Sequence, residues 1–396
     1  MNRTIYLSNS RLILLVLTMI FCTDSALVNT NSERIWARLS WIVIIILSVF
    51  FLSKAKLGGK RIALLIGFSI PILASMLIND GIDINYIQRI IIIWLGCAIA
   101  RSVDYHSFMR VFIKTMKLIA IVSLLGIFLK PILIALPLPH MHCGTNTFVN
   151  LILTNVSVTS TRNYGPFWEP GAFQLYLNWA IFYEIRYKDA FKIKDLILFV
   201  IAIITTHSTG GIMILTLIIV YYVLFCRQNN GIRNNIWPKI LTIATAISVV
   251  FVFLSKPELS DAFFGKLYAL QDNTNEINSD NVSSYTRLYS IHASIDAIKT
   301  SPIFGLGITG IKELAMETYG ITSNTNSILA FAATFGLLPG ILYFLLFVRT
   351  TKCIATSIYS AFIIFCILIA MFCTENMIVS LIFWIFLFYE SSKYKV

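Results

Sequence analysis

The sequence predicts an all-α, polytopic membrane protein: one integral membrane domain, residues 1–396, with about 12 transmembrane helices. Hydrophobic residues make up 57% of the chain and charged residues only 13%, about half the charged fraction of a soluble domain. Apolar runs recur along the whole length, and a transmembrane helix needs about 20 such residues. A β-barrel is excluded because runs such as "LSWIVIIILSVFFLS" do not alternate apolar and polar side chains.

Twelve apolar segments are interpreted as helices, with both termini on the inner side of the membrane. The first lacks a clear cleavage site and is interpreted as a retained helix, not a signal peptide. The stretch 195–226 is either two short helices around the turn "THSTGG" or one long tilted helix, which would require a different topology. The twelve segments are 11–28, 37–53, 62–79, 84–100, 118–136, 171–185, 195–208, 210–226, 238–255, 326–348, 354–372 and 376–390.

The net charge of +12 follows the membrane topology. With the N-terminus inside, the inner segments hold 21 of the 31 Lys and Arg residues, and the rest of the chain is net negative. This is the pattern of the positive-inside rule. We therefore expect no nucleic-acid partner.

Two outer segments are long, which predicts that the protein works on its outer face: a first outer loop at 137–170 and a large outer loop at 256–325 with amphipathic helices. In the second loop, "DAFFGKLYAL" predicts an interfacial helix and "SSYTRLYSIHASIDAIK" another helix. Arg287 lies at the edge of the apolar stripe of the latter. It either extends toward lipid phosphates or faces an anionic group held at the membrane surface.

The first outer loop ends in "RNYGPFWEPGAF", residues 162–173. Pro170 suits the first turn of a helix, and Glu169 then lies beside the positive end of the helix dipole. A capped helix start does not account for Arg162 or for the aromatic residues. Aromatic rings such as Tyr164 and Trp168 stack on sugars, a carboxylate accepts hydroxyl protons, and arginine matches phosphate.

Other polar residues give weaker signals. Arg89 lies within a predicted membrane helix, where it is either functional or extends outward. His140 and His142 form an isolated pair, and the seven cysteines show no paired spacing, so we expect no metal site and no disulfide framework. No nucleotide-binding motif is present, and no cofactor is expected.

Four stretches resemble the O-antigen polymerase and ligase superfamily. "RNYGPFWEP" is similar to its R-x-x-G-x-F-x-E-P motif, and "HSTGGIMILTL" to its S-x-x-G helix start. "SSYTRLYSIHASIDAIKTSPIFGLGITGI" resembles its outer loop, in which an arginine precedes a helix ending in P-h-h-G-h-G. "NTNSILAFAATFGLLPGILYFLLF" resembles the next segment of the family, with its N-x-x-L motif. The matches occur in family order over about 160–350, whereas the first 150 residues match only as generic membrane helices.

The resemblance implies a membrane glycosyltransferase of C-type architecture without metal or nucleotide. It acts on glycans linked to undecaprenyl pyrophosphate at the outer, periplasmic face of the bacterial inner membrane, among membrane lipids. A chain-length regulator protein is a candidate partner. By motif, the expected catalytic residues are Arg162, Glu169 and Arg287. The expected substrate-binding residues are Tyr164, Trp168, Asn326, Arg89 and His207.

The leading interpretation is a polymerase of lipid-linked oligosaccharide repeat units. A first alternative is a ligase that transfers the glycan to lipid A core or to protein. In the ligase branch a histidine usually precedes the asparagine of N-x-x-L, but this chain has Thr325 there, and its nearest histidine in sequence is His292. A second alternative, from another class, is a flippase or other transporter; the inverted repeats that transporters often show are not found.

Overall fold

The computed structural model describes residues 7–28, 34–143, 146–186, 192–226, 282–321 and 325–389. The chain forms two compact units, each built from several segments. Unit 1 comprises Met1–Leu57, Ile91–Ile218 and Val379–Val396, and unit 2 comprises Gly58–Ile90 and Ile219–Ile378.

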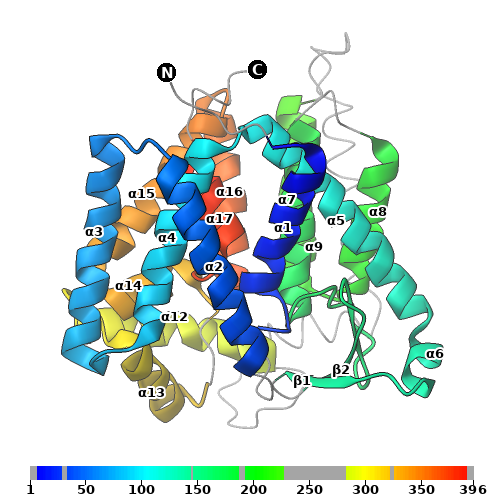
Figure 1. The fold of residues 1–396 in the computed structure, drawn as a ribbon, viewed down its shortest axis with the longest axis horizontal. Helices are drawn as coiled ribbons and strands as arrows, with labels where there is room; N and C mark the ends of the chain where they lie inside the picture. The colour runs from blue at the N-terminus through cyan, green and yellow to red at the C-terminus, as the bar shows by residue number, and fades with distance from the viewer. Residues whose placement is uncertain are drawn as a thin grey trace. The chain divides into compact units, whose positions relative to one another are not determined.

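Unit 1 is a bundle of helices with a small sheet (Figure 1). The end of α4 (Ile84–Ser102) and the start of α9 (Thr209–Tyr221) belong to it. Its other elements are α1 (Asn9–Met19), η1 (Ile20–Asp24), α2 (Arg34–Lys54), α5 (Tyr105–Phe128), α6 (Lys130–Ala135), α7 (Pro170–Arg186), α8 (Ile193–Thr205), α17 (Leu381–Phe388), β1 (His140–Cys143), β2 (Asn146–Asn150) and β3 (Asn155–Ser157).

Helix α7 forms the centre of unit 1. Every residue from Pro170 to Ile185 is buried, whereas a helix at a protein surface buries only one face. Aromatic side chains of α7 and α17 interlock there: Trp179 lies 4.9 Å, ring centre to ring centre, from Phe386, and Tyr176 lies 5.1 Å from Phe383. Such edge-on and tilted ring pairs are the geometry that aromatic side chains prefer. This core anchors the helix that contains the end of the Arg162–Phe173 stretch.

The segment 137–170, predicted to be the first outer loop, contains three strands, although the sequence predicts no strand. They pair antiparallel in the order β1-β2-β3. The sheet lies at the end of unit 1 where α6 also lies (Figure 1). Phe148 of β2 and Cys143 of β1 bury their side chains against Tyr164. The sheet therefore packs directly on the Arg162–Phe173 stretch.

Unit 2 carries the segments that resemble the large outer loop and the N-x-x-L segment of the superfamily. The helices α12 and α13 lie at one end of α3 and α15 in Figure 1. Its elements are α3 (Gly59–Ser75), η2 (Met76–Asp80), the start of α4, the end of α9, η3 (Tyr222–Cys226), α12 (Val282–Thr300), α13 (Gly307–Tyr319), α14 (Ser327–Phe335), α15 (Leu337–Ile354) and α16 (Ile358–Thr374).

Two glycines, one in each connection, allow the α12–α13 connection and the α14–α15 connection to lie against each other. A Cβ on Gly305 would lie 2.3 Å from the carbonyl oxygen of Thr334, and one on Gly336 would lie 1.9 Å from that of Ile303. Both glycines have positive φ, 68° and 96°, which other residues adopt only with strain. The close approach lets Leu306 N donate to the carbonyl of Ala333 at 2.9 Å, and Leu337 N donate to that of Pro302 at 2.8 Å.

The structure shows a multi-pass membrane protein. Among the described residues, five helices are long and apolar enough to cross a membrane: Ile35–Lys54, Gly59–Asp80, Ile84–Ser102, Tyr105–Phe128 and Leu337–Ile354. Helix α2 exposes a row of aliphatic side chains, including Ile42, Ile46 and Val49, as a lipid-facing helix does. Shorter apolar helices run over 209–225 and 358–374.

Several predicted helix limits were wrong. The helix expected at 118–136 begins at Tyr105, because the Asp104 side chain caps it by accepting from Ser107 N at 2.9 Å. The helix expected at 326–348 is two helices that meet at Gly336. The stretch 195–226 breaks into α8 and α9, which confirms the two-helix interpretation. The helices expected at 238–255 and in "DAFFGKLYAL" lie outside the described residues.

Candidate functional site

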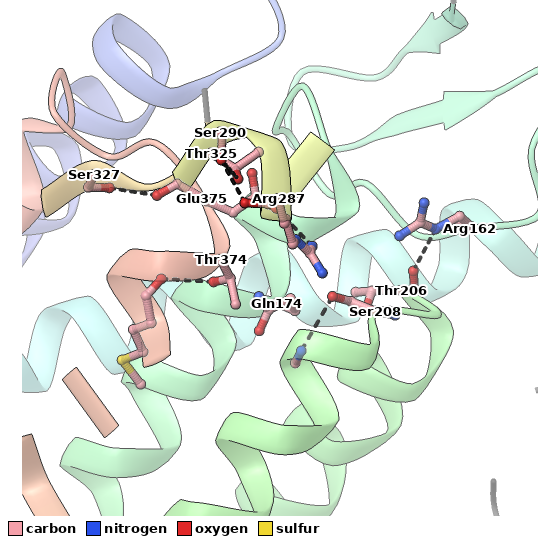
Figure 2. Close-up of polar contacts among 12 residues, drawn as sticks. Arg162, Gln174, Thr206, Ser208, Arg287, Ser290, Thr325, Ser327, Thr374 and Glu375 are labelled. Atoms are coloured by element: carbon pink, nitrogen blue, oxygen red, sulfur yellow. Dashed lines mark hydrogen bonds and ion pairs between the residues drawn. The ribbon is translucent and has the colours of Figure 1, made fainter. Parts of the chain in front are cut away.

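In unit 2, Arg287 of α12 forms an ion pair with Glu375. Its Nη2 atom lies 3.7 Å from Glu375 Oε1, and the two side chains are 26% and 6% exposed. Figure 2 shows both side chains. Glu375 directly follows the last residue of α16, and the sequence analysis did not select it as a site residue. A cation that keeps a quarter of its surface open beside a buried carboxylate can also bind an anion from outside.

The N-terminus of α14 lies beside this pair. Thr325 shares a hydrogen bond of 3.1 Å with Ser290 of α12 (Figure 2). It occupies the position at which the resembling ligases usually have histidine. The side-chain oxygen of Asn326 accepts from the backbone N–H groups of Ile328 and Leu329 and so caps α14. The Asn326 amide nitrogen lies 3.5 Å from Cys373 Sγ. Asn326 thus has a structural role, and its contact with sugar stays a prediction.

In unit 1, Arg162 is half-buried beside the turn between α8 and α9. Its Nε donates to the carbonyl of Thr206 at 3.0 Å (Figure 2). Its neighbour Asn163 is buried and donates to Ser123 Oγ at 3.1 Å and to Thr205 Oγ1 at 3.0 Å. These bonds fix the start of the motif to two helices and place the guanidinium at the turn.

His207 lies in that turn and is exposed, with a φ of 50°. The pKa of its imidazole lies below the usual value because of desolvation, and because the Arg162 cation is near. Lys130, at the start of α6, donates to the carbonyl of Ser160 at 2.7 Å and adds a cation to the same loop. The structure therefore brings Arg162 and His207 together, two of the residues that the sequence selected.

Most of the Arg162–Phe173 stretch has a structural role. Gly165 has a φ of 53°, and a Cβ there would lie 3.0 Å from the ring of Phe173. Tyr164 is buried, packs edge-on against Phe148 at 4.8 Å between ring centres, and donates to Asn146 Oδ1 at 3.3 Å. Phe167 is fully buried in the aromatic core. This explains why so many special residues occur in one short stretch.

Two residues of the motif remain accessible. Trp168 is half-buried against the cluster of Cys143, Phe148 and Tyr164. Glu169 is exposed at the N-terminus of α7, where Pro170 is the first helical residue, as the sequence indicates. The Tyr164 ring is therefore poorly placed for stacking on a sugar, whereas Trp168 and Glu169 stay candidates.

Arg89 lies in the second turn of α4, in the part that belongs to unit 2. Its Nη1 donates to the carbonyl of Asn85 at 3.0 Å, and the residue is half-buried. The side chain thus folds back toward the start of its own helix. This geometry fits the interpretation in which Arg89 extends toward the membrane surface, and its role in substrate binding stays a prediction.

An apolar cavity of about 730 Å³ lies between η1, α2 and the β1–β2 hairpin of unit 1. Phe21, Trp36, Leu39 and His140 contribute to its wall. His142 contacts Thr147 Oγ1 at 3.0 Å. Within the described residues, no three His, Cys, Asp or Glu side chains gather as a metal site requires.

The comparison with family models identifies a segment that spans parts of both units. A family model described as O-antigen ligase matches residues 196–345. Over this segment the chain is similar to the O-antigen ligase family. The match includes α12 with Arg287, the glycine-linked connections and Asn326, whereas Arg162, Glu169 and Glu375 lie outside it. A search of curated proteins finds no match. The family indicates an activity of the O-antigen ligase or polymerase kind, with a lipid-linked glycan as the general substrate.

Proposed function

We propose that this protein polymerises oligosaccharide repeat units linked to undecaprenyl pyrophosphate into O-antigen or a related surface polysaccharide. The reaction takes place on the outer face of the bacterial inner membrane. The donor is the growing glycan on its lipid pyrophosphate, and the acceptor is the non-reducing end of the next lipid-linked repeat unit. A chain-length regulator protein is a proposed partner.

The observation that carries the proposal is the Arg287–Glu375 site beside Thr325. When the glycosidic bond breaks, negative charge grows on the pyrophosphate leaving group. A cation fixed in advance acts most strongly where charge develops, and the Arg287 guanidinium is a planar fork that matches phosphate oxygens. Its exposed quarter gives such a group access.

The surroundings of Thr325 favour a polymerase over a ligase. A threonine has no group that titrates near neutral pH, so it cannot deprotonate a core-sugar hydroxyl. His292 is exposed on α12, and its ring lies 6.4 Å from that of Tyr319 on α13, with the two rings stacked. His292 is five residues from Arg287, so the two side chains point in directions about 140° apart around α12. This geometry supports a reaction that does not use a histidine at the Thr325 position.

Purified protein tests the proposal directly. Given only the lipid-linked repeat unit that accumulates in a deletion strain, it should form ladders of longer lipid-linked chains. Added lipid A core should yield no capped product, and His292→Ala should keep most of the activity. Transfer to lipid A core that His292→Ala abolishes would establish the ligase instead.

The role of Arg287 is tested in the same assay. Loss of one group that stabilises developing charge typically costs about 10²–10³ in rate, so Arg287→Ala should form no detectable ladder at a wild-type protein level. Arg287→Lys should recover little, because a point charge cannot replace the planar fork. Ladders at the wild-type rate from Arg287→Ala would refute the assignment.

A further inference from the structure

Glu375 is the only acidic residue between Glu317 and Glu390 in the sequence. It lies at the end of α16 in an extended conformation, with φ −144° and ψ 152°. Its side chain is only 6% exposed. A carboxylate is rarely buried to this extent without a partner, because removing the charge from water is costly. In the part of unit 2 that the structure describes, the ion pair with Arg287 provides such a partner for Glu375.

The backbone of Glu375 is held in place from α14. Ser327 Oγ donates to the Glu375 carbonyl at 2.6 Å and accepts from Met377 N at 2.8 Å. Ser327 is fully buried and is the first residue of α14, directly after the cap residue Asn326. The hydrogen bonds of one serine therefore fix both ends of the short turn that carries the carboxylate.

The contact with Glu375 leaves donors of the Arg287 guanidinium for a second anion. At 3.7 Å, Arg287 Nη2 and Glu375 Oε1 attract each other electrostatically but lie beyond ordinary hydrogen-bond distance, about 2.7–3.2 Å. Arginine has five N–H donors, more than this one contact uses. The carboxylate can thus hold one side of the guanidinium while its other donors reach a ligand.

We propose that Glu375 is a positioning residue for the glycan transfer, which holds Arg287 in the orientation that meets the pyrophosphate leaving group. This inference rests on the proposed function. The nearby negative charge also weakens the attraction of the site for a pyrophosphate in the ground state. Glu375 therefore raises the rate of the bound complex and lowers the affinity for the anion, two effects of opposite sign.

Glu375→Gln separates this role from a purely structural one, since it keeps the shape and removes the charge. In full-length protein, kcat should fall about 10- to 100-fold, as expected when a catalytic group is misplaced by about 1 Å. Inorganic pyrophosphate, added as an inhibitor, should bind about 3- to 10-fold more tightly, because a negative charge several ångströms away has been removed. Inorganic sulfate serves as the reference anion.

Glu313→Gln is the matched control, since Glu313 is an exposed acid on α13 of the same unit. It should change neither kcat nor pyrophosphate inhibition. If Glu375→Gln does not fold, Glu375→Asp replaces it. That variant keeps the charge and withdraws it by one methylene, so kcat should fall while pyrophosphate inhibition stays within about twofold of wild type.

The outcomes distinguish the two proposals. Wild-type kcat and inhibition in Glu375→Gln, together with an inactive Arg287→Ala, would refute the role of Glu375 and leave the proposed function standing. A lower kcat with unchanged pyrophosphate inhibition in folded Glu375→Gln would also refute it. Wild-type activity in Arg287→Ala would remove the basis of both.

Discussion

Gly336→Ala should destabilise the part of unit 2 that carries Arg287. The new Cβ would lie 1.9 Å from the Ile303 carbonyl oxygen, whereas carbon and oxygen normally approach to about 3.3 Å. The connection would have to shift by more than about 1 Å. The residue would also keep a φ of 96°, which costs about 1–3 kcal/mol for a side chain other than glycine.

The shift would break the hydrogen bond from Leu337 N to the Pro302 carbonyl, now 2.8 Å long. Pro302 and Leu337 are exposed residues, so the loss of this hydrogen bond costs about 0.5–1.5 kcal/mol. Together the two effects come to about 1.5–4.5 kcal/mol, against a total stability of about 5–15 kcal/mol for a typical protein. We expect a small yield of monodisperse protein and a clearly lowered Tm.

The assay is size-exclusion chromatography in detergent followed by thermal unfolding, monitored by intrinsic fluorescence. Gly320→Ala is the matched control, because Gly320 has a φ of 64° but nothing lies within 4 Å of its added Cβ. It should cost only about 1 kcal/mol. A Gly336→Ala protein as stable as Gly320→Ala would show that the two connections are not locked together as described.

Three further predictions concern unit 1 and the topology. Arg162→Ala should slow ladder formation by about 10²–10³-fold. Arg162→Lys should restore little, since lysine cannot both bond to the Thr206 carbonyl and present a planar fork. Wild-type ladders from the alanine variant would contradict this. Glu169→Gln keeps the helix start but removes the charge, so a general base at this position would show as a loss of about 10²–10⁴ in rate, and an unchanged rate would make Glu169 structural. Reporter fusions after Gly59 should read as inside and those after Asp80 as outside; the opposite result would overturn the charge-based orientation.

The sequence predicts the membrane class and the two arginines because their signals are local. Apolar runs, the excess of basic residues on one side and the motif around Arg162 can be recognised in single stretches. The break between α8 and α9 was also predictable, since basic residues flank both ends of 195–226. The start of α5 was missed because Arg110, Lys114 and Lys117 give its first half the composition of an inner loop, which hides a helix that Asp104 caps.

Glu375 could not be predicted from a local pattern. Its partner Arg287 is 88 residues earlier in the sequence, and only the fold of unit 2 brings them within 3.7 Å. The one available signal was a single acid between two apolar helices on the predicted outer side. Tyr164 shows the opposite error: an aromatic residue near a carboxylate suggests sugar binding, but its ring fills the core beneath a sheet that the sequence did not predict.

Helix α8 is shorter than the hydrocarbon core of a typical membrane is thick. Its 13 residues extend about 20 Å, against about 30 Å for the hydrocarbon core of a typical membrane. If α8 crosses the membrane as the sequence predicts, the bilayer beside it must become thinner or the helix must draw its ends inward, and both responses have a modest cost per ångström. The turn after α8 contains the Thr206 carbonyl, which accepts a hydrogen bond from Arg162. A change in the position of the end of α8 would therefore change the position of this acceptor. We therefore expect lipid acyl chain length to affect the geometry of Arg162 indirectly, through the turn after α8.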